Sequence, residues 1–168
     1  MTTRGHRTQA DPEPAPELWS ELADLVLRIA REIQFRGYTD PDAVTLSTSE
    51  GMVMRHLQRG DGSTPTLLAE ETGLQRTNLS VVLRGLERKG LVERTVSPQD
   101  RRYVTVSATE RGRRNYELVR QEWARAVSEA AGGAAEDLRA ATSLLRTIES
   151  GLVETRPATS GRSGARAE

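Results

Sequence analysis

The feature that most constrains the fold is a change of hydrophobic period inside the stretch from Thr64 to Gly112. Thr64-Pro65 places an N-cap residue before a proline at the first helical position, and Gly73 ends the short helix that follows. Two helices joined by a short turn that contains Gly predict a helix-turn-helix. The second helix is predicted from about residue 75 to residue 89, with one apolar side formed by Leu79, Val82, Leu83 and Leu86.

The chain changes to an alternating pattern after Gly90. Residues 91–96 and 102–107 are rich in β-branched side chains and flank the turn-forming segment 97–101. This pattern predicts a β-hairpin. A helix-turn-helix followed directly by a hairpin predicts a winged helix-turn-helix, in which the hairpin is the wing.

Two amphipathic helices are predicted before this unit. Residues 17–35 carry one apolar stripe at helical spacing. Ser47 and Glu50 can form a capping box that opens a second helix, which runs to about residue 59. We expect the inward side of this second helix to be Met52, Val53, His56 and Leu57.

Two further helices are predicted after the hairpin. Thr109 can cap a helix that runs to about residue 131, and a last helix is predicted at about 134–153. At 1.5 Å per residue the helix that begins near Thr109 is roughly 34 Å long. A helix of that length, with the helix that follows it, extends beyond a small domain, so we expect it to pack on a further partner.

These elements define the expected domain organisation. Residues 1–15 and 154–168 are polar and lack apolar periodicity, so we expect disordered tails. Residues 16–153 are predicted to form a single unit. Within it the winged helix-turn-helix occupies about 46–108, and long helices that flank it occupy 17–35 and 109–153. The predicted fold class is mainly α with a small β-hairpin wing.

The lack of Cys and the presence of only two His exclude several kinds of site. Without Cys there is no disulfide, Cys-ligated zinc site or thiol redox sensor, and two His leave little material for a catalytic triad. We find no phosphate loop and no nucleophile–base pair, so we expect neither an enzyme nor a bound cofactor or metal. No apolar run approaches about 18 residues, so we expect a cytoplasmic protein without membrane association.

The charge distribution indicates an acidic partner for one segment. The net charge is zero over 168 residues, but residues 74–114 carry 10 basic and 4 acidic side chains, a net charge of +6. Residues 1–73 and 115–168 have net charges of −5 and −1. Such a concentration of positive charge is expected of a segment that faces DNA phosphates; a solvated charged face is the alternative.

The outward side of the predicted helix at 75–89 carries side chains that can read DNA. Arg can donate two hydrogen bonds to guanine, Asn can pair with adenine, and an apolar side chain can contact the thymine methyl group. The hydroxyls of Ser and Thr suit phosphates or bases. An ordinary amphipathic helix is the alternative, but its solvated face would mix Glu with Lys. The candidate DNA-binding residues of this helix are Arg76, Thr77, Asn78, Ser80, Val81 and Arg84.

Asp100, Arg101 and Arg102 stand at the predicted tip of the hairpin. A wing beside a recognition helix can place Arg in the minor groove, where negative potential is concentrated. We therefore add Arg101 and Arg102 to the candidate DNA-binding residues. We expect Asp100 to hold a neighbouring Arg in an ion pair and so to fix the shape of the wing. A plain charged turn would be the better interpretation of a hairpin that stood alone.

Several short motifs together resemble the MarR family of multiple antibiotic resistance regulators. They are the run Leu-Glu-Arg-Lys-Gly-Leu-Val-Glu-Arg at 86–94, the wing triplet at 100–102, and Thr109-x-x-Gly112. The helix pair contributes Leu68-Ala69-Glu70 and Gly73-Leu74. The similarity covers about residues 17–153, and its most specific part runs from the end of the second helix of the pair to Gly112.

The resemblance implies a homodimer in which the first helix and the last two helices interlock, with a recognition helix in successive major grooves. It also implies a pocket for a small aromatic or amphipathic ligand between the dimerisation helices and the DNA-binding lobe. Gln75 stands where the family often has Asp or another good cap, and Val81 stands where it often has a polar residue or Arg. The candidate pocket residues, which core or dimer packing would also explain, are Phe35, Tyr38, Met52, Arg55, His56, Tyr116 and Trp123.

The function that these observations favour is sequence-specific transcriptional regulation. We expect a homodimeric repressor that binds double-stranded DNA at a pseudo-palindromic operator and is released by a small-molecule ligand. The alternative is a winged-helix module that binds proteins and has lost specific DNA binding. The sequence names neither the operator, the regulated genes, the ligand nor the sign of regulation.

Overall fold

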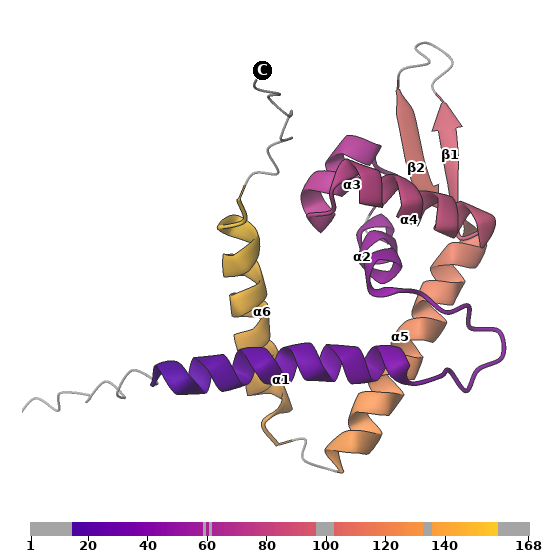
Figure 1. Ribbon diagram of the computed structural model, residues 1–168. Helices are drawn as coiled ribbons and strands as arrows, with labels where there is room; N and C mark the ends of the chain where they lie inside the picture. Colours follow the sequence, from indigo (N-terminus) through magenta and orange to yellow (C-terminus); the bar gives the residue numbers. More distant parts are fainter. Residues whose placement is uncertain (1–14, 59, 61, 97–102, 133–135, 158–168) are drawn as a thin grey trace, which may run out of the picture. The chain divides into compact units, whose positions relative to one another are not determined.

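The computed structural model describes residues 15–58, 60, 62–96, 103–132 and 136–157, and the chain divides into two units, residues 1–36 and 37–168. The described part of the first unit is helix α1, Pro16–Phe35, close to the predicted range (Figure 1). None of its side chains is buried. The guanidinium of Arg31 lies 5.3 Å from the ring centroid of Phe35, a cation–π contact within the helix.

The second unit contains the predicted helix-turn-helix and hairpin (Figure 1). The mainly helical fold with one antiparallel hairpin is therefore confirmed. Among the described residues, no helix is long and apolar enough to span a bilayer. The elements in order are α2 (Thr48–Leu57), α3 (Pro65–Thr72), α4 (Arg76–Arg88), β1 (Val92–Val96), β2 (Val104–Ala108), α5 (Glu110–Ala131) and α6 (Leu138–Glu154).

Side-chain caps begin three of these helices where the sequence predicts them. The Ser47 hydroxyl accepts from the Glu50 backbone N–H at 3.2 Å, and the Glu50 carboxylate accepts from the Ser47 backbone N–H at 2.8 Å. The hydroxyls of Thr64 and Thr109 accept from the backbone N–H groups three residues later. Each cap satisfies a backbone donor that the helix itself leaves unpaired, and so determines where the helix begins.

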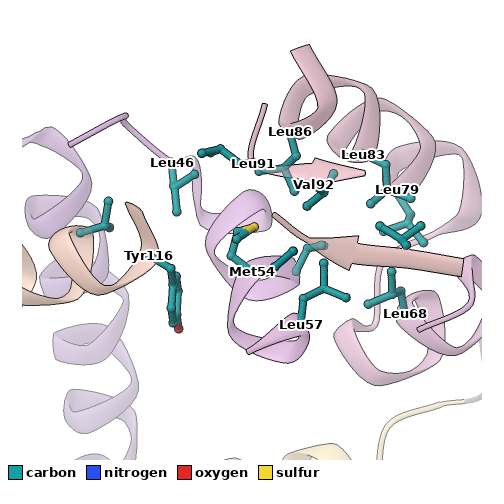
Figure 2. Packing of buried hydrophobic residues seen from close by; sticks show 14 of the residues in the cluster. Leu46, Met54, Leu57, Leu68, Leu79, Leu83, Leu86, Leu91, Val92 and Tyr116 are labelled. Carbon is teal, nitrogen blue, oxygen red and sulfur yellow. The ribbon is translucent and has the colours of Figure 1, made fainter. Parts of the chain in front are cut away.

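The hydrophobic core lies between α2, the helix pair α3–α4, the hairpin and the first half of α5 (Figure 2). The buried side of α2 corrects one prediction: Met54 is fully buried, whereas Met52 is 38% exposed and His56 is half-buried. Glu50, Val53, Met54 and Leu57 form the buried stripe, at spacings of three and four residues. The prediction is confirmed for Val53 and Leu57, whereas the buried methionine is Met54 and not Met52.

The hairpin pairs Val92 with Ala108 and Val96 with Val104. β2 thus lies one or two residues later than predicted. The sequence did not predict a further backbone partner of β2. Ser63 forms a bridge to Val106 through two backbone hydrogen bonds of 2.9 and 2.8 Å. This bridge ties the chain before α3 to the base of the wing. The tip of the wing, residues 97–102, lies outside the described residues.

Helices α5 and α6 differ in burial. α5 buries Tyr116 and Val119 against the core, whereas no residue of α6 is buried. α5 ends at Gly132, which adopts the left-handed conformation with φ 57°. α6 begins at Leu138, later than the predicted start near residue 134, because helix propensity alone does not determine where a helix begins.

Two polar side chains of α5 hold the segment that precedes α2. Asn115, which is 3% exposed, pairs with both backbone groups of Val44: its Oδ1 accepts at 2.6 Å and its Nδ2 donates at 3.0 Å. The Glu122 carboxylate accepts from the backbone N–H and the hydroxyl of Thr39, at 3.0 and 2.8 Å, and pairs with Arg125 at 2.8 Å. These bonds fasten residues 39–44 to α5 along its length.

Gly112 is required by a close approach of two backbones. Thr109 Oγ1 donates to the Gly90 carbonyl at 2.8 Å, and the Thr109 N–H donates to the Leu91 carbonyl at 3.1 Å. A Cβ atom on Gly112 would overlap the carbonyl of Leu91. The Thr109-x-x-Gly112 motif therefore seats the start of α5 on the chain that joins α4 to β1.

We expect Gly112→Ala to destabilise the chain by about 3 kcal/mol, because neither backbone can move away without breaking the Thr109 bonds. The measurement is urea unfolding followed by circular dichroism. The control is Gly151→Ala in α6, where a Cβ meets nothing within 4 Å. That change should stabilise the chain by about 0.5–1 kcal/mol, since Ala favours helix over Gly. A Gly112→Ala protein as stable as the parent would contradict the role of the close approach.

The Glu122 network predicts a pH dependence. The ion pair with Arg125 and the hydrogen bonds from Thr39 lower the pKa of Glu122 from 4.5 to about 2. Because the folded-state pKa lies below the unfolded value, the network stabilises the fold fully above about pH 4.5 and this contribution is lost as the pH falls towards 2. The difference in melting temperature between the parent and Glu122→Gln should therefore shrink over this range.

A matched control for this experiment is Glu117→Gln. Glu117 and its partner Arg120 are both more than half exposed. An ion pair of that kind contributes little to stability, so Glu117→Gln should follow the parent across the whole pH range. A difference between the parent and Glu122→Gln that stays constant from pH 7 to pH 2 would contradict the assigned pKa of Glu122.

Candidate nucleic-acid interface

Helix α4 has one buried side and one exposed side. Leu79, Leu83 and Leu86 are buried in the core (Figure 2). Val82 is partly buried against it, so the predicted inward side is confirmed. The opposite side faces solvent, with Val81 59% exposed. We call the outward set of side chains the α4 face: Arg76, Thr77, Asn78, Ser80, Val81 and Arg84, all of which are exposed.

The α4 face is positively charged because the acid of α4 is turned away from it. Glu87 is the acidic residue of this helix, and its Oε1 pairs with Nε of Arg94 in β1 at 2.6 Å. Arg76 and Arg84 make no ion pair with another described residue. Their guanidinium groups are therefore available to an external acceptor such as a phosphate or a guanine edge.

The first turn of α4 has no side-chain cap. Gln75 occupies the N-cap position, and its side chain accepts no hydrogen bond from the helix. The first backbone N–H groups of α4 therefore stay available to solvent or to an anion, and the helix dipole favours an anion there. Gln75, which stands where a good capping residue would be expected, thus leaves backbone N–H donors at the start of α4 without a side-chain cap.

Ser80 can contribute less to phosphate binding than its residue type suggests. Its hydroxyl donates to the Arg76 carbonyl one turn earlier, at 3.0 Å. In this arrangement Ser80 offers acceptor lone pairs outward and no free proton. It is therefore better suited to accept from a base than to bind a phosphate oxygen.

The Glu87–Arg94 pair also joins the wing to α4. The two side chains are 31% and 37% exposed, and Arg94 lines a cavity of about 200 Å³ between α3, α4 and β1. Arg76 and Ser80 of the α4 face line the same cavity. Sequence analysis quoted both members of this pair within the run at 86–94 and gave neither a role. The wing-tip residues Asp100, Arg101 and Arg102 lie outside the described residues.

A second ion pair fixes α4 against α2. Lys89 Nζ donates to both carboxylate oxygens of Glu50, at 2.8 and 2.7 Å, and to the Thr45 carbonyl at 2.9 Å. The Glu50 side chain is only 10% exposed. The carboxylate that caps α2 therefore also holds the C-cap residue of α4, which keeps this Lys away from the α4 face. The capping box predicted the first role of Glu50, and only the structure shows the second.

The candidate pocket residues of the second unit fall into two groups by their printed contacts. Tyr116 and Trp123 pack edge to face with their centroids 6.5 Å apart, and Tyr38 and Trp123 lie against the core cluster. Met52 and His56 line a separate cavity of about 280 Å³ together with Arg55. Phe35 belongs to the first unit. In the described part of the chain, no three His, Cys, Asp or Glu side chains could jointly hold a metal ion.

The chain matches known transcriptional regulators. A profile of the MarR family matches residues 44–102. An uncharacterized HTH-type transcriptional regulator of Mycobacterium bovis is 32% identical over 112 residues, which are 63% of this chain and 73% of that protein.

Solved structures of similar fold include DNA-bound and ligand-bound proteins. The transcriptional repressor CouR, bound to a 23-mer DNA duplex, is 26% identical, with a TM-score of 0.62 over 83% of this chain and 99% of that one. NadR in complex with 4-hydroxyphenylacetate is 21% identical, with a TM-score of 0.57 over 89% of this chain and 99% of that one.

The uncapped start of α4 gives a prediction for Gln75→Ser. A Ser hydroxyl at the N-cap accepts from the first turn of the helix, so this change should stabilise the fold by about 0.5–1 kcal/mol in urea unfolding. The matched control is Thr64→Ala, which removes the bond of 3.2 Å that caps α3 and should cost about 1 kcal/mol. A loss of stability in Gln75→Ser would mean that the Gln side chain already supports the helix.

Proposed function

The chain belongs to the MarR family and is a DNA-binding transcriptional regulator, and we propose that it acts as a homodimeric repressor on a pseudo-palindromic operator. We propose further that a small-molecule ligand releases it from DNA. The observation that carries the proposal is the α4 face, which presents Arg76 and Arg84 while the acid of the same helix is paired with Arg94.

In this proposal the α4 face lies in the major groove. Arg76 and Arg84 are the side chains that can donate two hydrogen bonds to a guanine edge, and Asn78 can pair with adenine. Val81, which is 59% exposed, can contact a thymine methyl group. Thr77 and the acceptor oxygen of Ser80 complete the face, and the uncapped backbone N–H groups of α4 can bind a phosphate.

The wing is proposed to contact the minor groove through Arg101 and Arg102, with Asp100 holding one of them in an ion pair. Support comes from the base of the hairpin. The Glu87–Arg94 pair joins β1 to α4, and the Ser63–Val106 bridge joins β2 to the chain before α3. Because both strands of the hairpin are held at their start, the proposed wing can reach only a limited stretch of DNA. We therefore expect a fixed spacing between the major-groove and the minor-groove contacts.

The proposed dimer is supported by two helices that bury nothing within one chain. α1 carries an apolar stripe with Leu18 57% and Ile29 52% exposed, and α6 carries Leu138 and Leu152 at 59% and 67%. Contiguous exposed apolar surface of this kind marks an interaction site in a protein that stays in solution. A two-fold dimer would place its recognition helices roughly 34 Å apart, one turn of DNA.

The proposed ligand is a small aromatic or amphipathic molecule. The similarity to NadR, whose structure contains 4-hydroxyphenylacetate, supports a ligand of this size. Among the described residues, the Tyr116–Trp123 cluster and the cavity lined by Met52 and His56 offer suitable side chains.

The DNA-binding proposal predicts different effects for two Arg substitutions, measured by fluorescence anisotropy on DNA selected from random sequence. Arg84→Ala should weaken binding to the selected site by about 1–3 kcal/mol and relax the base preference at one position. Arg101→Ala should weaken selected and random DNA about equally and lower the slope of the salt dependence by about 1.

The control for both is Arg120→Ala, which removes an exposed Arg of α5 outside the proposed interface. If Arg84→Ala and Arg101→Ala bind like the parent, the assigned residues are wrong. If the parent itself selects no sequence from random DNA, a protein-interaction module is the better description.

A further inference from the structure

The cavity of about 200 Å³ between α3, α4 and β1, which we call the wing-base cavity, combines apolar and cationic side chains. Its lining includes Leu79 and Leu83 of α4, which are buried (Figure 2). It also includes two exposed arginines, Arg76 of α4 and Arg94 of β1. The first residues of α3 line it as well, and among the described residues no Asp or Glu does. Two guanidinium groups without an acid favour an anionic occupant.

The two arginines of the α4 face lie on different sides of the helix. At about 100° per residue, the eight residues from Arg76 to Arg84 turn the helix by about 80° beyond two full turns. Arg84 shares a row with Thr77, seven residues before it, and is not a lining residue of the cavity. Arg76 shares a row with Ser80 and Leu83, and this row lines the cavity. Arg76 and Arg84 therefore face different parts of a bound DNA.

Arg94 reaches the same cavity from the base of the hairpin. Its Nε pairs with Glu87 Oε1 at 2.6 Å, and its side chain is 37% exposed. A guanidinium carries five N–H donors, and a carboxylate that pairs through Nε engages at most two of them. The remaining donors of Arg94 can therefore bind a second acceptor. Glu87 holds Arg94 in place for this contact without using all of its hydrogen-bonding capacity.

The wing-base cavity has one uncompensated positive charge. Glu87 balances Arg94, whereas Arg76 makes no ion pair within the described part of the chain. Thr66 of α3 adds a hydroxyl, which can donate to a phosphate oxygen. A DNA backbone has the matching chemistry, because each anionic phosphate stands between two deoxyriboses whose carbon atoms suit the apolar part of the lining.

We infer that the wing-base cavity seats one phosphate of the DNA backbone, held jointly by Arg76 and Arg94, an assignment that rests on the proposed function. It divides the work of the α4 face: Arg84 reads a base edge, whereas Arg76 binds the backbone and carries no sequence information. Arg94, to which the sequence assigned no role, becomes a DNA-binding residue. The bound phosphate is held by α4 and by β1 at once, so it sets the register of both on the duplex.

The test uses the full chain and its selected DNA site, in which single phosphates are replaced one at a time by neutral methylphosphonates. Affinity is measured by fluorescence anisotropy. For the parent, replacing the phosphate that occupies the cavity should weaken binding by about tenfold, because charge-assisted hydrogen bonds are lost. Arg76→Gln should bind the unmodified site about tenfold more weakly and should no longer respond to that one replacement. Its base preference should equal that of the parent.

Arg94 is tested together with Glu87. Arg94→Gln alone would leave the Glu87 carboxylate unpaired beside the phosphate, and this repulsion would weaken binding whether or not Arg94 contacts DNA. The variant that carries both Glu87→Gln and Arg94→Gln removes the two charges together. It should lose its response to the same methylphosphonate position as Arg76→Gln. The slope of the salt dependence should fall by about 1 per bound chain in either variant, and by no more when all three changes are combined, since one phosphate is involved.

Two controls bracket the result. Arg84→Ala should keep the methylphosphonate response of the parent while its base preference relaxes, and Arg120→Gln in α5 should bind like the parent. Circular dichroism should show each variant folded, since none of the altered side chains is buried.

The site is overturned if Arg76→Gln relaxes a base preference, or if Arg76→Gln or the Glu87→Gln, Arg94→Gln variant keeps the full methylphosphonate profile of the parent. Either result, obtained with a parent that binds its selected DNA, would leave the proposed regulator standing. A parent that selects no sequence from random DNA would overturn the proposed function, and this site with it.

Discussion

The carbonyl group of Leu91 is the contact on which the packing of α4, the hairpin and α5 depends. It follows α4 and begins the wing, it accepts from the Thr109 N–H, and the bare backbone of Gly112 lies against it. α4, the hairpin and α5 therefore meet at one peptide group. A side chain at residue 112 would push α5 away from Leu91, so the seating of α5 on the chain between α4 and β1 depends on the absence of a single Cβ atom.

Ion pairs around this junction decide which charges remain on the outside. Glu87 turns to Arg94 and Glu50 turns to Lys89, so two acids near α4 are paired away from its exposed side. Arg76 and Arg84 stay unpaired among the described residues. The α4 face therefore carries the positive charge of Arg76 and Arg84 with no acid among its six residues. The same pairs fasten the wing and α2 to α4, so structural support and charge placement come from the same contacts.

Much of the fold was predictable because the signals are local. The caps at Ser47, Thr64 and Thr109 and the stripe Leu79, Leu83, Leu86 act within one or two helical turns. The face of α2 was predicted only in part, since a helix that is apolar on more than one side gives no unique inward direction, and packing selected Met54 over Met52. The Ser63 bridge and the Asn115–Val44 pair could not be predicted, because their partners are 43 and 71 residues apart in the sequence.

The sequence by itself determined the elements, the winged helix-turn-helix and the identity of the exposed side of α4, because helical period, caps and turn residues act over a few residues. The tertiary structure alone decided how these elements are held: Glu50 with Lys89, Glu87 with Arg94, and Arg55 with Glu149 are pairs between helices or between a helix and a strand. No short-range pattern marks such pairs. Each needs two side chains brought together by the packing of a common core, and only the folded chain specifies that distance.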